Sequence, residues 1–276
     1  MTTLTAQLEA NLAVVSGRIA AACARVGREP GEVTLVAVTK YARPDWVRGL
    51  VSLGVRDLGE SRPQQLAERA GWFDEAVRWH LVGPLQRNKV RKVLALRTQG
   101  VSGAGVGCPE FNFPRGVLDP MTTSNGKLNS GHPTPSTSPA LIHSVDSPRL
   151  LTAIDRIAAE ERLQPRVLLE VNVSGDEAKH GFAPEELLQS WDEISAATHV
   201  TVAGLMTMAP WDDDPERSRP VFRRLRELRD ELSSRCSERG RLPELSMGMS
   251  GDYEVAVEEG ATLVRIGSRL IDGLEK

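Results

Sequence analysis

Apolar and polar residues follow two alternating patterns along this chain, one typical of buried strands and one typical of amphipathic helices. Eight short apolar runs have the pattern of buried strands, at residues 33–38, 55–60, 79–83, 141–146, 166–173, 202–208, 243–249 and 262–268. Stretches with one apolar face separate most of them, at residues 44–53, 62–70, 148–162, 184–198 and 215–239, and several begin with a helix-starting proline. Eight strand–helix units in 276 residues predict an α/β fold of the (β/α)8 barrel type, with an open doubly wound sheet as the alternative.

The first 26 residues have the pattern of an amphipathic helix that packs on the fold. Apolar residues recur there at helical spacing, at Leu8, Leu12, Val15, Ile19, Cys23 and Val26. Charged residues lie among them, so the segment does not have the composition of a signal peptide. We therefore expect an N-terminal helix in front of the barrel.

Residues 98–140 interrupt the alternation of strands and helices. They contain seven glycines and six prolines, a composition that cannot easily bury a core. The segment follows a helical stretch and precedes the strand at Leu141, so it is a helix-to-strand connection, which in a barrel lies on the face opposite the active site. We predict one domain over residues 1–276 with a flexible insertion at 98–140.

Composition and charge exclude several classes of partner. The net charge is −3 and no basic stripe is present, so we expect no nucleic acid partner. No apolar run approaches the roughly 20 residues of a membrane span, so we expect no membrane partner. The three cysteines have neither metal-site nor CxxC spacing, which is typical of a reducing compartment, and we expect a cytoplasmic location.

The candidate chemistry lies where the predicted strands end. Lys40 directly follows the first strand, and SMGMSGD (246–252) and RIGS (265–268) follow the seventh and eighth. Many barrels bind phosphate at these last two strands, through loop amides and closely approaching glycines. A lysine amine beside a phosphate site suits a phosphorylated aldehyde, either pyridoxal 5′-phosphate (PLP) or the sugar phosphate of a class I aldolase. Arg265, which could donate to a pyridine nitrogen, favours PLP.

Other common sites have no support in the sequence. No carboxylate pair is placed for glycoside hydrolysis, and no nucleophile elbow is present. The histidines are scattered singly, so we expect no metal site. We interpret His80 and His143, which lie inside strand runs, as core residues with satisfied hydrogen bonds.

Eight ordered motifs carry a resemblance to a known family. They are LVAVTK, DLGES, WHLVGPLQRNK, IHSVDS, EVNVSGDEAKHGF, GLMTM, LSMGMSGDYEVAVEEGAT and VRIGS, and they cover nearly the whole chain outside residues 98–140. With them the chain resembles the YggS-like, or proline synthase co-transcribed, family of pyridoxal phosphate homeostasis proteins. The resemblance implies a fold-type III barrel like the N-terminal domain of alanine racemase.

The resemblance also implies a cofactor site. Lys40 would hold PLP as an internal aldimine, and Arg265 would face the pyridine nitrogen. The phosphate would be bound by Ser246, Gly267 and Ser268, and the pocket would be lined by Asn172 and Met247. The family usually has Gly-Glu-Asn where this chain has Ser61 as the third residue, so ring contacts are expected to be weaker.

The family is thought to buffer or deliver PLP, with no catalytic reaction generally assigned. We therefore expect a PLP-binding homeostasis protein, with PLP-dependent apoenzymes as candidate recipients, that is a monomer or a weak dimer. The alternative is a low-activity racemase, which needs a second proton acceptor opposite the lysine. The only tyrosines are Tyr41, expected to point away from Lys40, and Tyr253, expected to start a helix. Because the chain ends at Lys276, we expect no second domain to supply another.

Overall fold

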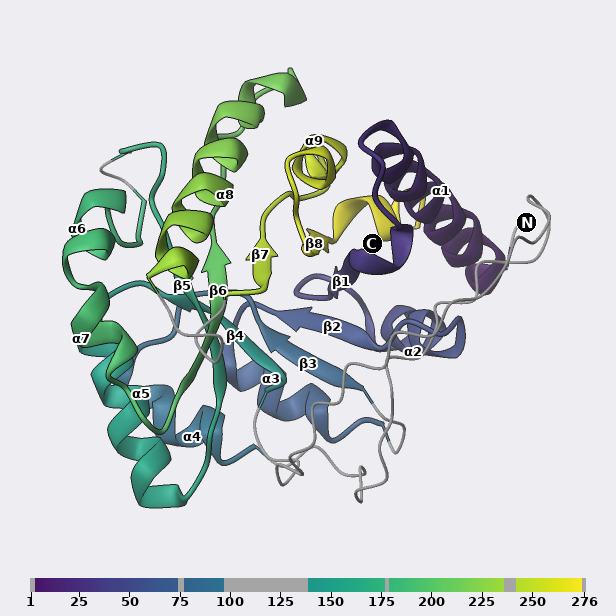
Figure 1. Ribbon diagram of the computed structural model, residues 1–276. Coiled ribbons are helices and arrows are strands. Elements are labelled where there is room, and N and C mark those ends of the chain that lie inside the picture. The colour runs from purple at the N-terminus through teal and green to yellow at the C-terminus, as the bar shows by residue number, and fades with distance from the viewer. Residues whose placement is uncertain (1–2, 74–76, 97–138, 177–178, 236–241, 275–276) are drawn as a thin grey trace, which may run out of the picture.

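Eight parallel strands close into a barrel in the computed structural model, which describes residues 3–73, 77–96, 139–176, 179–235 and 242–274 (Figure 1). The strands are β1 (Thr34–Val38), β2 (Asp57–Glu60), β3 (Arg78–Leu81), β4 (Leu141–Val145), β5 (Arg166–Glu170), β6 (Thr201–Met206), β7 (Glu244–Ser246) and β8 (Leu263–Ile266). They follow chain order around the barrel, and β8 pairs with β1 over Thr34–Ala37. The predicted barrel is confirmed, and the open sheet was the wrong alternative.

Several strands end earlier than the apolar runs that predicted them. The run at 166–173 continues beyond β5, where Val171 forms only an isolated bridge with Phe182. The run at 243–249 gives the three-residue strand β7, because Gly248 has a φ of +88°, which an extended chain cannot contain. The residues past these strand ends form loops at the mouth of the barrel.

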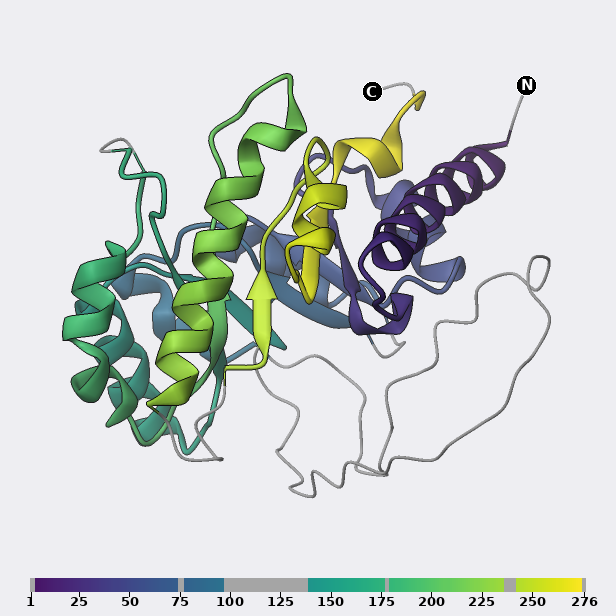
Figure 2. The same cartoon turned by 45° about the horizontal axis from the view of Figure 1, so that its top comes forward.

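An N-terminal helix lies outside the barrel, as predicted. The helix α1 (Leu4–Arg25) packs against α2 (Pro44–Ser52), α9 (Tyr253–Glu258) and the 3-10 helix η5 (Ser268–Ile271). Leu8, Val15 and Ile19 are buried on its inner face. Figures 1 and 2 both show α1 beside α9, next to the elements that follow β7 and β8.

The remaining helices surround the barrel as the connections between strands. They are α3 (Pro63–Ala70), α4 (Val90–Leu94), α5 (Pro148–Glu161), α6 (Pro184–Gln189), α7 (Trp191–Ser195) and α8 (Arg219–Ser234), with the 3-10 helices η1 (Pro30–Glu32), η2 (Arg87–Lys89) and η3 (Pro215–Ser218). Five of the described α-helices have a proline in the first turn, as the sequence predicted. The helix expected at 184–198 is two helices, which meet at Ser190 because its backbone departs from helical geometry.

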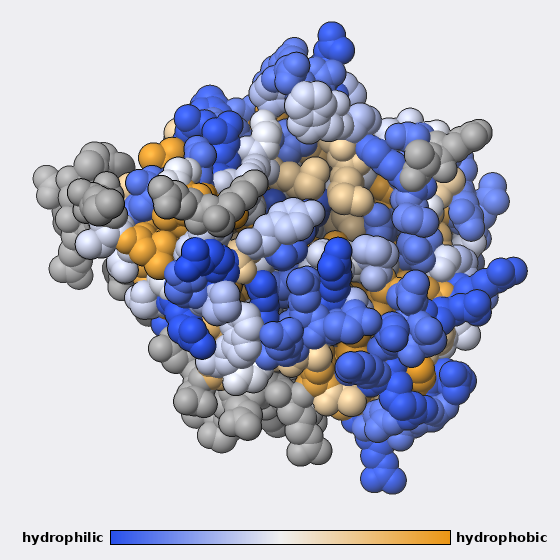
Figure 3. All heavy atoms as spheres, turned by 180° about the vertical axis from the view of Figure 1, so that it is seen from behind, coloured by the Kyte–Doolittle hydropathy of each residue, from blue (hydrophilic) through white to orange (hydrophobic). Residues whose placement is uncertain are grey.

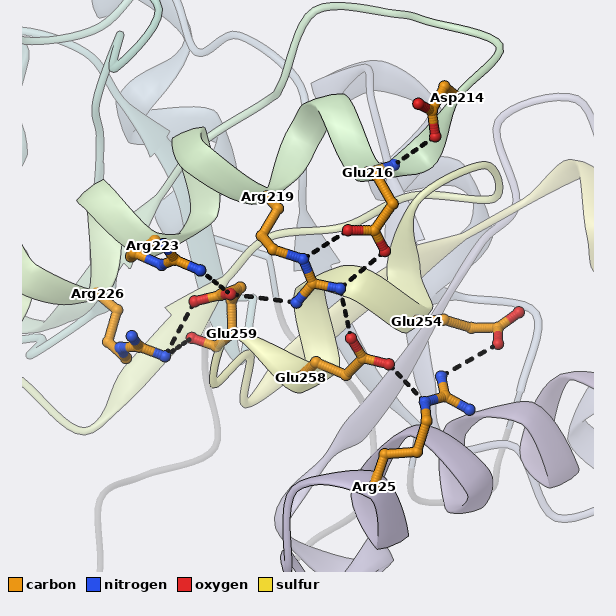
Figure 4. A network of polar contacts seen from close by, with 9 residues as sticks. All are labelled: Arg25, Asp214, Glu216, Arg219, Arg223, Arg226, Glu254, Glu258 and Glu259. Atoms are coloured by element: carbon orange, nitrogen blue, oxygen red, sulfur yellow. Dashed lines mark hydrogen bonds and ion pairs between the residues drawn. The ribbon is translucent and has the colours of Figure 1, made fainter.

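A network of ion pairs links α8 and α9 and reaches α1 (Figure 4). The Arg219 guanidinium donates to Glu216 and Glu258 and also pairs with Glu259. Arg25 of α1 pairs with Glu258, so α9 is held from two sides. Since α9 begins just after the loop that follows β7, the network fixes one end of that loop.

The surface has the expected balance of side chains. Figure 3 shows the side opposite to Figure 1, where hydrophilic side chains cover most of the area and hydrophobic ones form smaller areas between them. Among the described helices, none is both long and apolar enough to cross a membrane.

Most of the predicted insertion at 98–140 lies outside the described residues, and Pro139 and Ala140, directly before β4, are its described end.

Candidate functional site

The turn that carries Lys40 is held by two buried side chains from neighbouring elements. Nη1 of Arg69, in α3, donates to the carbonyl oxygen of Thr39 at 2.5 Å, and Nη2 donates to that of Ala42 at 3.0 Å. Glu60, at the end of β2, accepts from Arg69 at 2.6 Å and from the Thr39 hydroxyl at 2.5 Å. These hydrogen bonds fix the backbone on both sides of Lys40, but they do not involve the lysine side chain.

Lys40 itself points to solvent. Its side chain is exposed, and its ammonium nitrogen lies 5.1 Å from the centroid of the Tyr41 ring. The prediction that Tyr41 points away from Lys40 was wrong, because the chain has already left the strand and side chains no longer alternate. The amine is therefore accessible to a ligand at the mouth rather than buried in the barrel.

Glu60 is a buried acid that the sequence did not single out for a role. It is fully buried, and its Oε2 has no hydrogen-bond partner among the described residues. Burial raises the pKa of Glu60, while hydrogen bonds from Thr39 and the charge of Arg69 oppose the rise. Such a group persists in the interior because Arg69 pairs with it.

The loop after β7 (residues 247–252) and the loop that begins at Gly267 after β8 meet next to the end of β1, and we call them the loop pair. A Cβ on Gly267 would lie 3.1 Å from the carbonyl oxygen of Val38, so glycine allows a close backbone approach there. The Gly267 N–H donates to Ser250 Oγ at 3.3 Å, and Arg269 Nε donates to the Ser250 carbonyl at the same distance. Since β8 pairs with β1, the structure brings this loop pair to the strand that leads to Lys40.

This loop pair offers hydrogen-bond donors to a ligand. Among the hydrogen bonds of the described residues, none engages the backbone N–H of Ser268 or of Arg269, and both side chains are exposed. The preceding turn depends on Gly248, since a Cβ there would lie 2.9 Å from Tyr253 Cα. Free N–H groups beside a guanidinium suit an anion such as phosphate.

Arg265 and Ser246 lie inside the barrel, below this loop pair. Arg265 donates through Nη1 to Ser246 Oγ at 2.6 Å and through Nη2 to the Thr207 carbonyl at 2.9 Å. Burial lowers the pKa of Arg265 to about 10, opposed by the charges of Asp252 and Glu170. The guanidinium is therefore a buried cation at neutral pH. The Ser246 hydroxyl is already engaged, by Arg265 and by His143 at 2.8 Å.

Asn172 and Met247 were predicted to line a pocket. Asn172 lies in the loop after β5, where its Nδ2 donates to the Asp176 carbonyl at 2.8 Å and its Oδ1 accepts from Ser174. Met247 is fully buried after β7. Both follow strand ends at the mouth, and their contact with a ligand stays a prediction.

The other half of the mouth contains a cleft of about 930 Å³. Its lining combines cationic and polar side chains from the ends of β2 to β4, including Ser61, Arg62, Arg87, Lys89, Asp146 and Arg149. Neither Lys40 nor Gly267 lines it, so the cleft is separate from the loop pair. In the described part of the chain, no group of three or more His, Cys, Asp and Glu side chains is placed to hold a metal ion.

Comparison with known proteins gives consistent matches. Residues 117–272 match the family described as alanine racemase, N-terminal domain. The pyridoxal phosphate homeostasis protein of Aquifex aeolicus is 36% identical and that of Deinococcus radiodurans is 37% identical, each over 94% of this chain and over 95% and 97% of those proteins, respectively.

Solved structures agree with these sequence matches. PipY of Synechococcus elongatus with PLP bound has a TM-score of 0.67 and 29% identity, and the match covers 91% of this chain and 99% of PipY. An alanine racemase of Clostridium difficile has a TM-score of 0.61 at 12% identity, over 98% of this chain and 57% of that one, which shows a shared fold.

Proposed function

Because this chain belongs to the family of pyridoxal phosphate homeostasis proteins, we propose that it binds PLP at the mouth of the barrel and acts in PLP homeostasis. The observation that carries the proposal is the meeting of two features at neighbouring strand ends. One is the accessible amine of Lys40, and the other is the donor-rich loop pair at Gly267 and Ser268. When bound, PLP supplies an aldehyde that combines with amines and an electron-withdrawing ring.

Lys40 is the proposed covalent anchor of PLP. The turn around it is fixed by Arg69 and Glu60, so little backbone freedom is lost when the side chain engages a ligand. The contact with Tyr41 is exposed and weak, of the order of 0.5–1 kcal/mol, so the amine leaves it at small cost.

The phosphate is proposed to lie against Gly267 and Ser268, where the backbone approaches closely and N–H groups are free. Asn172 and Met247 are proposed to form part of the pocket wall. Ser246 was expected to contact the phosphate as well. Its engaged hydroxyl supports a different role, that of an acceptor for Arg265.

Arg265 disfavours transaminase-type chemistry. A guanidinium has only donors, and with a pKa of about 10 it keeps its proton at neutral pH. It can donate a hydrogen bond to the ring nitrogen without transferring a proton, so the ring withdraws electrons less strongly. Together with the family match, this supports the proposal that the protein buffers PLP, or delivers it to PLP-dependent apoenzymes in the cytoplasm, without an assigned catalytic reaction.

Low racemase activity is the alternative function. It needs proton acceptors on opposite sides of the substrate carbon, and Tyr41 lies on the same side as Lys40, against its ammonium. Incubation of amino acids with the PLP-loaded protein in D₂O tests this alternative. We expect no deuterium at the α-carbon above the level given by free PLP.

The binding proposal is tested by adding PLP to the purified protein, removing the excess and recording the visible spectrum. We expect a retained yellow band in the wild type and in Lys92→Ala, an exposed lysine on α4, and its loss in Lys40→Ala. A protein that retains no PLP would overturn the proposal. A band of unchanged intensity in Lys40→Ala would overturn the role of Lys40.

A further inference from the structure

Five buried polar side chains form a continuous hydrogen-bond chain through the barrel. Arg265 contacts Ser246 at 2.6 Å, Ser246 contacts His143 at 2.8 Å, His143 contacts His80 at 2.9 Å, and His80 contacts Asp57 at 2.9 Å. They come from β8, β7, β4, β3 and β2, and none is more than 7% exposed. Buried polar groups are costly unless satisfied, so an interior chain of five requires an explanation.

This series of hydrogen bonds runs from the amino-terminal end of the barrel strands to the mouth of the barrel. Asp57 is the first residue of β2 and pairs with Arg78, the first residue of β3. At the other end, Ser246 is the last residue of β7, and Arg265 lies two residues before Gly267. The two ends of the chain are therefore at opposite ends of the strands.

If both histidine rings are neutral, the direction of every hydrogen bond in this series follows from its two ends. Burial alone would raise the pKa of Asp57, but hydrogen bonds from Arg78 and His80 outweigh it and lower the pKa to about 2. A carboxylate only accepts, so His80 donates to it through Nε2–H and accepts at Nδ1. His143 must then donate through its Nε2–H.

The same reasoning continues to Arg265. Burial lowers the pKa of His143 well below its usual range, and the charge of Arg265 acts in the same direction, so the ring is neutral and its Nδ1 accepts from the Ser246 hydroxyl. Ser246 then accepts from Arg265, which can only donate. With both histidine rings neutral, every donor points from Arg265 toward Asp57, whereas a protonated His80 would reverse both hydrogen bonds of His143.

We propose that Asp57, His80, His143 and Ser246 form a positioning relay that fixes the guanidinium of Arg265 toward the cofactor. Two of the five N–H donors of Arg265 are used by Ser246 and Thr207 among the described residues. The relay holds the two bonded nitrogens of the guanidinium in place and leaves the remaining donors for the ring nitrogen, which is proposed to lie at the mouth. The inference rests on the proposed function, because it assigns these residues to the same site.

The relay is tested first in the protein without PLP. Nitrogen-15 NMR of the histidine rings distinguishes the two neutral tautomers, and we expect both His80 and His143 as the Nε2–H form at neutral pH. A protonated ring or an Nδ1–H tautomer at either histidine overturns the relay. This measurement does not depend on PLP binding.

The second test measures PLP affinity in variants. Ser246→Ala removes the acceptor of Arg265, and we expect about tenfold weaker PLP binding, the size of one charge-assisted hydrogen bond. The matched control is Ser144→Ala, which removes an equally buried strand hydroxyl whose one hydrogen-bond partner among the described residues is the Gly83 carbonyl. An equal loss in the control would reduce the effect to general destabilisation and overturn the positioning role.

Asp57, at the end of the hydrogen-bond series farthest from Arg265, offers the most discriminating variant. Asp57→Asn keeps the shape of the side chain, and Asp57 is separated from Arg265 by three intervening residues. We expect weaker PLP binding together with a changed His80 tautomer. Unchanged affinity in both Ser246→Ala and Asp57→Asn overturns the relay and leaves PLP binding intact, whereas a wild-type protein that binds no PLP contradicts the proposed function instead.

Discussion

Nη1 of Arg69 lies 2.5 Å from the carbonyl oxygen of Thr39, the residue immediately before Lys40. The same nitrogen contacts Glu60 Oε1 at 2.6 Å, so one buried ion pair also supports the turn that presents the lysine. Arg69 of α3 and Glu60 of β2 therefore position the turn from which Lys40, the proposed anchor, extends.

Loss of Arg69 is expected to destabilise the protein strongly. Arg69→Met leaves the carboxylate of Glu60 buried without its partner, at a cost of about 3 kcal/mol in the free energy of unfolding. Urea denaturation measures the loss. The double variant Arg69→Met with Glu60→Leu is expected to recover much of it, because both charges are gone. Equal stability of the single variant and the wild type would contradict the role of the pair.

Asp57 gives the protein a defined acid sensitivity. Its folded-state pKa of about 2 is below the usual 3.8, so its contribution to stability is present above pH 4 and is lost as the pH falls toward 2. The shift corresponds to about 2 kcal/mol. Asp57→Asn is expected to lower stability by up to about that amount at pH 7 and by much less near pH 2. Denaturation at both pH values tests this, and a pH-independent difference would contradict it.

Two glycines of one loop are expected to respond differently to the same substitution. Gly248 has a φ of +88°, and a Cβ there would lie 2.5 Å from Ala256 Cβ, so Gly248→Ala should cost more than about 1 kcal/mol and weaken PLP binding. Gly251→Ala meets no atom within 4 Å and is expected to be nearly neutral. Thermal unfolding of the two variants compares them directly, and equal losses would show that the turn geometry is not required.

The ion-pair network at α9 is expected to stabilise the protein in a salt-dependent way. Arg219→Ala removes contacts with three glutamates, one of them largely buried, and should lower the free energy of unfolding by about 1 kcal/mol at low salt. The loss should shrink at 1 M salt because of screening. Arg224→Ala on the same helix is the control, since Arg224 has no ion pair among the described residues. A loss that does not change with salt would point to packing instead.

The sequence predicted the barrel, and it predicted Lys40 and Gly267 at neighbouring strand ends, because both features depend on local patterns. Apolar runs located each strand, and Lys40 and Gly267 became site candidates because they directly follow strands that a closed barrel makes neighbours. The contact of Tyr41 with Lys40 was missed because it depends on a turn rather than on strand alternation.

The buried polar contacts could not be predicted in the same way. Arg69 has the spacing of an ordinary helix position, and only the fold shows that it faces Glu60. His80 and His143 were correctly placed in the core, but their contact joins residues 63 positions apart and depends on the register of two strands. Registers of this kind are set by the whole barrel, not by the residues themselves.

Lys40 is the proposed anchor of PLP. Borohydride reduction of the PLP-loaded protein, followed by peptide mapping with mass spectrometry, identifies the lysine that carries the cofactor. We predict a single pyridoxyl modification on Lys40, absent from Lys40→Ala. A modification on another lysine, such as Lys89 in the cleft, or PLP that binds without any reducible bond, would contradict the role of Lys40 as the anchor.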